Sequence, residues 1–165
     1  MRLDNIAELF SEDANINSLK NKSTYLQGRE KIRQSFQATK PRAATVSMRV
    51  LIDGPNKEKA EPSPRVTFCV DMHRAQCSPG LGDASKNTIL LYRCDNKHIT
   101  NVWGMTDTEG LAVDRGLTLS KFMDSAAWHM VAAVVESDVE LSAPDAMGKS
   151  PSLHFHNYDT MDTWG

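Results

Sequence analysis

The residues best suited to chemistry in this chain are a single carboxylate after one strand-like segment and a carboxylate–imidazole pair inside another. Asp107 follows "ITNVWGMT" and precedes "TEGLAVDRGL", a short apolar stretch that Gly116 interrupts. A carboxylate at the mouth of an apolar pocket has a raised pKa and can transfer protons near neutral pH. The same carboxylate can instead cap a helix by accepting hydrogen bonds from its first amides, with Glu109 adding favourable charge. Both roles are open for Asp107, although a carboxylate held as a cap is a poor proton shuttle.

Asp71 and His73 form the second candidate pair. They lie two residues apart in "RVTFCVDMHRAQC", so on a strand they share one face. An aspartate beside an imidazole can orient it and form an acid/base dyad. The opposite face of this segment is sharply apolar and is expected to look inward; it carries Val66, Phe68, Val70 and Met72. The alternative to catalysis is therefore that Asp71 and His73 lie on a polar outer surface or at a subunit interface.

Several side chains on the predicted strands are candidates for substrate contact: Phe68, Met72, Tyr92, Asn101, Trp103 and Met105. Aromatic and apolar residues of a curved sheet serve as core or as pocket lining, and Asn101 offers a polar anchor on the Trp103 side. His154 and His156 have the spacing of two metal ligands on a strand, but no third ligand is identifiable. No phosphate-binding loop or Ser-His-Asp order occurs. We therefore expect neither a metal nor an organic cofactor.

Composition limits the classes of function. A chain of 165 residues with 40% hydrophobic and 24% charged residues is typical of one globular domain. The net charge of -2 gives no reason to expect a nucleic-acid partner. No apolar run is long enough to span a membrane and no secretion signal is visible, so a cytoplasmic location is expected. The three cysteines, Cys69, Cys77 and Cys94, are an odd number and indicate reduced thiols with a packing role.

Two periodicities indicate the elements that must position these groups. Helical spacing predicts a short helix over Leu3–Phe10 and another after Gly28, where Ile32 and Phe36 are one turn apart. Alternation predicts four long strands, over about residues 44–53, 65–77, 88–95 and 98–107. Because no helix separates them, these strands should form an antiparallel meander with one face covered by helices. An amphipathic helix is predicted over about residues 119–135.

The segments "IAELFSEDANI", "GREKIRQSF" and "ITNVWGMTD" resemble the SnoaL-like polyketide cyclase family, within the nuclear transport factor two and ketosteroid isomerase superfamily. The resemblance covers roughly residues 3–117. It implies an α+β fold with a cone-shaped curved antiparallel sheet wrapped around helices, a cystatin-like or SnoaL-like barrel that encloses a hydrophobic pocket. We expect this barrel over residues 1–117, an amphipathic helix over 118–136 that packs on the barrel or on a partner, and an irregular tail over 137–165.

The resemblance also implies a function. In the cyclases an aspartate late in the sheet is the general acid/base, and Asp107 lies in the matching region. We expect a cofactor-free cyclase, isomerase or hydrolase that acts on a small hydrophobic molecule, as a homodimer through its outer sheet face. The alternative is a noncatalytic ligand-binding or dimerisation module of the same fold. Ketosteroid isomerase activity is not expected, because Phe10 and no tyrosine stands in the opening segment. The opening helix is short, so the helix at 119–135 is expected to close the cone in its place.

Overall fold

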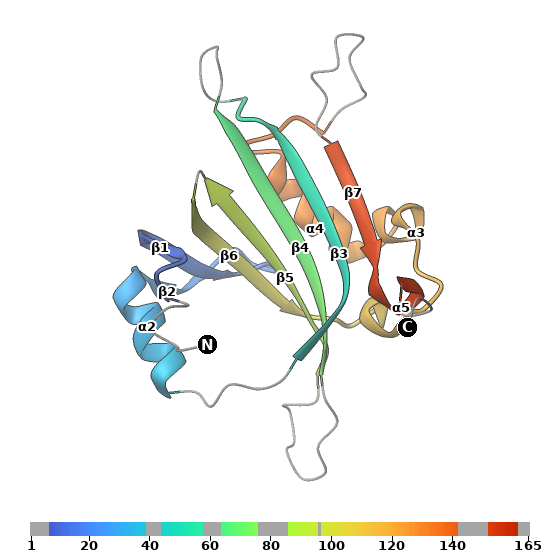
Figure 1. Cartoon of the computed structure of the whole chain (residues 1–165), viewed down its shortest axis with the longest axis horizontal. Helices are drawn as coiled ribbons and strands as arrows, with labels where there is room; N and C mark the ends of the chain where they lie inside the picture. The colour runs from blue at the N-terminus through green and yellow to red at the C-terminus, as the bar shows by residue number, and fades with distance from the viewer. Residues whose placement is uncertain are drawn as a thin grey trace.

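The chain folds into one mixed sheet with helices on both of its faces (Figure 1). The computed structural model describes residues 7–38, 44–57, 64–75, 86–95, 97–141 and 152–161. Its seven strands lie in the order β2-β1-β6-β5-β4-β3-β7. In chain order the elements are β1 (Phe10–Ser18), β2 (Thr24–Gln27), α2 (Arg29–Ala38), β3 (Ala44–Pro55), β4 (Arg65–Ala75), β5 (Thr88–Asp95), β6 (His98–Thr106), the 3-10 helix η2 (Leu111–Val113), α3 (Leu119–Met123), α4 (Ala126–Val135), β7 (Ser152–Asn157) and α5 (Tyr158–Met161).

The predicted antiparallel meander is confirmed by strands β3 to β6. Neighbouring strands pair so that Val50 lies opposite Val70 and Val70 lies opposite Leu91. Residues opposite each other in a sheet point to the same face, and all three side chains are fully buried. The alternation of apolar and polar residues therefore brings one row of apolar side chains from each strand onto a common face.

The first strand makes the sheet mixed, which corrects the expectation of a purely antiparallel sheet. β1 pairs antiparallel with β2 and parallel with β6. β1 also begins at Phe10, inside the segment whose spacing predicts a helix, and only Ala7 of the described residues there is helical. Within the described residues, β2 and β7 are the two edges of an open sheet, so the expected closed barrel is not formed.

The apolar face of the sheet is covered by the C-terminal helices. Phe122 of α3 and Trp128, Val131 and Val135 of α4 belong to one buried cluster with the apolar row of the meander. Figure 1 shows α4 lying behind β3 and β4. The predicted helix at 119–135 therefore packs on its own sheet. It is divided into two helices, because Ser125 caps α4 by accepting a hydrogen bond from the Trp128 amide at 3.1 Å.

The opposite face of the sheet is only partly covered. α2 packs Ile32 against Phe10 and Val102 at the end of the sheet formed by β1 and β6. The middle of this face carries five polar or ionisable residues, Arg49, Cys69, Asp71, His73 and Tyr92, which the strand register brings together. We call this group the polar face. The expected helical cover of one face is supplied by α3 and α4, and α2 adds cover at the end of the opposite face.

The C-terminal segment is more ordered than its loss of periodicity indicates. Residues Ser152–Asn157 form β7, which pairs antiparallel with β3. The Asn157 side chain donates hydrogen bonds to the carbonyls of Arg115 and Leu117, both at 3.4 Å, and ties β7 to the loop before α3. The expected irregular tail over 137–165 is thus corrected for residues 152–161; residues 142–151 and 162–165 lie outside the described part of the chain. Among the described residues, no helix has the length and apolar character needed to cross a membrane.

Candidate functional site

The polar face is organised around an ion pair between Arg49 and Asp71. These residues lie opposite each other on β3 and β4, and the guanidinium binds the carboxylate through two bonds, Nε–Oδ1 at 2.6 Å and Nη2–Oδ2 at 2.8 Å. Asp71 is only 4% exposed. The hydrogen bond from Arg49 to Asp71 raises the pKa of the guanidinium, as expected for a two-pronged arginine–carboxylate contact. With both oxygens bound, Asp71 fixes its neighbours and is poorly placed to carry protons itself.

His73 lies beside this ion pair on the same strand face. Its Nε2 is 3.9 Å from Asp71 Oδ2, which is too long for a hydrogen bond. Nε2 is buried and has no hydrogen-bond partner among the described residues. Burial lowers the pKa of the imidazole, and the charge of Arg49 lowers it further, while Asp71 opposes both effects. At neutral pH the ring is therefore uncharged and keeps one nitrogen as an acceptor.

Cys69 and Tyr92 complete the polar face as neutral donors. Burial raises the pKa of the Cys69 thiol and of the Tyr92 phenol, and the charge of Asp71 raises both further. The Cys69 thiol donates a hydrogen bond to Asp71 Oδ1 at 3.2 Å. A protonated, buried thiol is unreactive, so the role of a nucleophile does not suit Cys69. The face therefore offers one neutral base, one fixed ion pair and two neutral hydrogen-bond donors.

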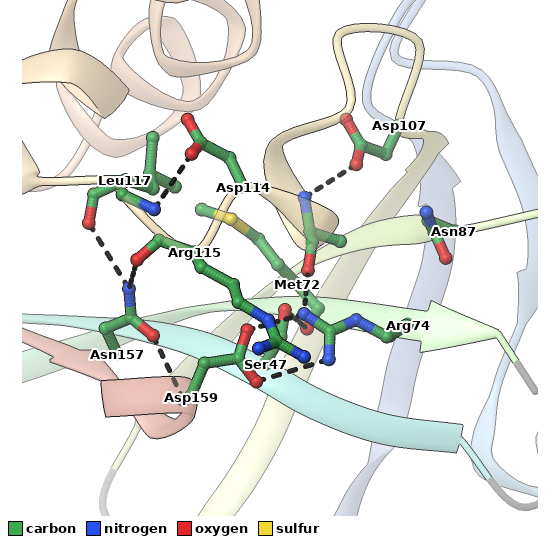
Figure 2. Close-up of polar contacts among 12 residues, drawn as sticks. Ser47, Met72, Arg74, Asn87, Asp107, Asp114, Arg115, Leu117, Asn157 and Asp159 are labelled. Atoms are coloured by element: carbon green, nitrogen blue, oxygen red, sulfur yellow. Dashed lines mark hydrogen bonds and ion pairs between the residues drawn. The ribbon is translucent and has the colours of Figure 1, made fainter. Parts of the chain in front are cut away.

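Asp107 is a helix cap in the structure. Its Oδ1 accepts a hydrogen bond from the Leu111 amide at 3.0 Å and its Oδ2 accepts one from the Ala112 amide at 2.8 Å. Figure 2 shows the carboxylate turned toward the backbone of η2. The capping alternative is confirmed. The expected proton-transfer role is corrected, because both oxygens are engaged by backbone amides of the adjoining turn.

A second ion pair lies near η2 and has a structural role. Arg74 of β4 binds the Asp159 carboxylate of α5 and donates a hydrogen bond to the Ala112 carbonyl at 2.9 Å (Figure 2). The hydrogen bond raises the pKa of Arg74 and lowers that of Asp159. These contacts join the C-terminal segment, β4 and η2, so their role is to hold three elements together.

Three of the expected substrate contacts are core residues. Phe68 and Met72 are fully buried on the apolar face, and Met105 packs against the same cluster. The space between this face and the C-terminal helices is occupied by side chains, so no ligand can reach Phe68 or Met72. Their expected role in substrate binding is corrected to packing. The reason is that α3 and α4 fill the hollow that the resemblance implies.

The remaining expected contacts are divided between the two faces. Tyr92 lies on the polar face, opposite Cys69. Trp103 pairs with Leu91 and therefore points to the other face, where it lines an open groove together with Asn101. Arg49 was missed by sequence reasoning, because only the pairing of β3 with β4 places it against Asp71. The alternation in "ATVSMRVLID", which places Arg49 in the row opposite Val46, Met48, Val50 and Ile52, is the signal that could have indicated it.

Metal ligands do not gather in the described part of the chain. Within residues 7–38, 44–57, 64–75, 86–95, 97–141 and 152–161, no group of three or more His, Cys, Asp or Glu side chains is arranged to hold a metal ion. His154 and His156 lie on β7 opposite Leu51 and Arg49. Cys69 and Cys94 are free thiols, and Cys77 lies outside the described residues.

Comparison with known proteins adds no assignment to this geometry. No family model, no curated protein and no solved structure matches the chain. The function must therefore be inferred from the polar face itself.

Proposed function

We propose that the chain is a SnoaL-like domain whose polar face binds a small hydrophobic carbonyl compound and transfers a proton next to the carbonyl, without a cofactor. The observation that carries this proposal is the neutral, half-buried imidazole of His73 beside the Arg49–Asp71 ion pair. Perturbed ionisable groups that gather on one surface are typical of functional sites. The succession of α2 and the four-stranded meander, which the resemblance also implies, supports the same assignment.

Two residues of the polar face, His73 and Tyr92, carry this chemistry. His73 accepts the proton through Nδ1, because Nε2 is buried and turned toward Asp71. The electrons of the broken C–H bond form a carbon–carbon double bond, and those of the carbonyl move to its oxygen. Tyr92 donates a hydrogen bond to this developing oxyanion, which is the kind of contact that lowers the barrier most. Return of the proton from the imidazolium to the same carbon regenerates the ketone and gives hydrogen exchange, whereas delivery to another carbon of a conjugated enolate gives an isomer.

Two leucines give the polar face an apolar border for the body of the ligand. Leu51 lies opposite Cys69, and Leu90 lies opposite Asp71, so both project from the same face as the polar groups. Both are half-buried and can contact a bound ring. A few polar groups surrounded by apolar contacts are the usual composition of a small-molecule site.

The experiment uses 2-tetralone, a two-ring ketone, dissolved in D2O with the protein. Deuterium uptake next to the carbonyl, followed by proton NMR, reports proton transfer directly. We expect exchange above the buffer rate with the native chain, and a loss of about 10²-fold or more in His73→Gln, the usual contribution of a general base. Tyr92→Phe should lower the rate while leaving binding intact. His98→Gln, at an exposed histidine, and Asp107→Asn are the matched controls and should exchange at the native rate.

The same experiment separates the two functions that the sequence leaves open. Exchange that persists unchanged in His73→Gln would remove the proposed base. Binding of 2-tetralone at the polar face without any exchange would support the noncatalytic ligand-binding alternative, in which the Arg49–Asp71 pair and its neighbours only orient the ligand. Absence of both binding and exchange would contradict the proposal.

A further inference from the structure

A hollow lies on the other side of the sheet from the polar face. It is an open groove of about 550 Å³ between strands β5 and β6, the β1–β2 turn and the end of α4. Its lining residues are Lys22, Arg93, Asn101, Trp103, Ala133, Val134, Ser137 and Asp138. The volume lies within the range of about 300–1,000 Å³ typical of small-molecule sites. The residues of the polar face are absent from this set.

The walls of the groove favour a flat ligand. Trp103 is half-buried and packs against the core cluster, so its ring is held in place by the protein. Ala133 and Val134, at the end of α4, form the apolar wall of the same groove. An aromatic ring held at a partly exposed position provides a stacking surface for a second ring.

The charges of the groove favour an anion. The Arg93 guanidinium is balanced by Asp138, with Nε 2.7 Å from Oδ2. The Lys22 ammonium instead donates to two backbone carbonyls, of Leu19 at 2.7 Å and of Met130 at 3.5 Å. Among the described residues no carboxylate lies within 4.0 Å of this ammonium. Lys22 therefore contributes a positive charge that no carboxylate balances, unlike Arg93. These carbonyls hold the ammonium at the groove without neutralising it.

The backbone of Lys22 adds a separate argument. Lys22 has φ 63°, and within the described residues no other position except glycine has a positive φ. This conformation costs a residue with a Cβ about 1–2 kcal/mol, a cost that glycine does not have. The turn itself is closed by the Lys22 amide, which donates to the Ser18 carbonyl at 2.9 Å, a bond that glycine would also form. A lysine at a position that favours glycine indicates a use for its side chain.

We propose that this groove binds a planar aromatic anion, with its ring against Trp103 and its carboxylate on the Lys22 ammonium. The site is independent of proton transfer at the polar face, because it uses the opposite side of the sheet. The ring supplies apolar contact, and the charged hydrogen bond from Lys22 supplies orientation.

The test is a titration with 2-naphthoate, compared with the neutral 2-naphthamide, by calorimetry and by proton–nitrogen NMR. We expect 2-naphthoate to shift the Trp103 indole and Val134 amide signals. Lys22→Met should weaken binding by about tenfold, the effect expected for one charged hydrogen bond, and 2-naphthamide should bind more weakly by a similar factor. Lys20→Met is the matched control, since Lys20 is an exposed lysine of the same turn, and it should bind as the native chain does. Lys22→Gly should lose the same affinity with an unchanged or higher melting temperature.

Four outcomes would overturn the proposal. These are no binding of 2-naphthoate, equal binding of the amide, native affinity in Lys22→Met, or signal changes at His73 and Tyr92 instead of Trp103. Deuterium exchange of 2-tetralone by Lys22→Met should stay at the native rate. A failure of the proposed anion site in the groove can therefore be distinguished from a failure of the proposed proton transfer at the polar face.

Discussion

At the scale of single residues, the carboxylates of Asp107 and Asp71 are both engaged, one by backbone amides and the other by a guanidinium. Neither can easily give up its contacts to accept a substrate proton. The imidazole of His73 differs, because it is neutral, has no such bond at Nε2 among the described residues and is partly exposed. The chemical capacity of the chain therefore depends on a histidine, with aspartates in supporting roles.

Asp107→Ala tests the capping role. Loss of a capping carboxylate typically lowers the free energy of unfolding by about 0.5–2 kcal/mol, and we expect a value near the middle of that range. Urea denaturation followed by circular dichroism measures it. Asp114→Ala offers a comparison at the other end of η2, where the carboxylate makes a single exposed contact to the Gly116 amide, and it should cost less. Unchanged stability in Asp107→Ala would contradict the capping role.

The Arg49–Asp71 pair gives a prediction about buried charge. Arg49→Met leaves the Asp71 carboxylate buried without its partner, so we expect a loss toward the lower end of about 3–5 kcal/mol in the free energy of unfolding, because Arg49 itself is partly exposed. The double variant Arg49→Met/Asp71→Leu removes both charges and should recover part of this loss. Denaturant unfolding of the two single variants and the double variant gives the coupling. Purely additive effects would indicate that the pair does not act as a unit.

The lowered pKa of His73 predicts a pH dependence of stability. In the unfolded chain the imidazole takes up a proton near its ordinary pKa, whereas the folded chain resists this until a lower pH. The unfolded state therefore binds more protons in that window, so the free energy of unfolding falls as the pH falls through it. Between about pH 7.5 and about 5.5 we expect a smaller fall in His73→Gln than in the native chain. The plot of unfolding free energy against pH for His98→Gln should follow that of the native chain. Parallel plots for all three proteins would contradict a lowered pKa of His73.

At the scale of elements, the bounds of the meander strands could be predicted from the sequence, but the pairing of β1 and the division of the C-terminal helix could not. β5 begins and ends where alternation places it, and β3, β4 and β6 differ from their predicted bounds by at most two residues. Alternation is a local property, so it can be read from one segment. The parallel pairing of β1 with β6 joins residues about 85 positions apart, as Ile16 and Val102 show, and no local pattern contains that information. The break before α4 depends on the Ser125 hydroxyl, a capping signal inside a continuous apolar pattern.

The docking of α4 on the apolar face predicts which of its residues carry stability. Val131→Ala removes two buried methyl groups from the contact between α4 and the sheet, so we expect a loss of about 2 kcal/mol in the free energy of unfolding. His129→Ala, at an exposed position of the same helix, should change it by less than about 0.5 kcal/mol. Thermal or urea unfolding of both variants measures the difference. Equal effects would mean that α4 does not pack as described.

At the scale of the whole molecule, the position of the candidate site depends on which face of the sheet the C-terminal helices cover. Sequence reasoning correctly separated the apolar row that contains Phe68 from the polar row that contains Asp71. It assumed that the apolar row lines a pocket, but the C-terminal helices fill that side and leave the polar row partly exposed. Which face of a sheet receives a later helix is set by the packing of distant segments. Arg49 escaped prediction for the same reason, whereas Trp103 and Asn101, both predicted ligand contacts, line the groove on the other face.

The expected homodimer stays a prediction, and the packing of α4 restricts which face of the sheet can form it. α4 already covers the apolar face, so a dimer through a face of the sheet would have to use the polar face and would cover His73. We expect that face to stay accessible. Sedimentation equilibrium gives the mass in solution, and the His73 amide signal should not change with protein concentration. A concentration-dependent change there would place a subunit interface on the proposed site.

The most direct test of the central claim is to locate the binding of 2-tetralone on the intact chain by proton–nitrogen NMR. We expect the largest signal changes to fall on His73, Leu90 and Tyr92 of the polar face, and we expect His73→Gln to reduce them. Signal changes confined to the apolar face or to the Trp103 groove would contradict the claim that the polar face is the binding site.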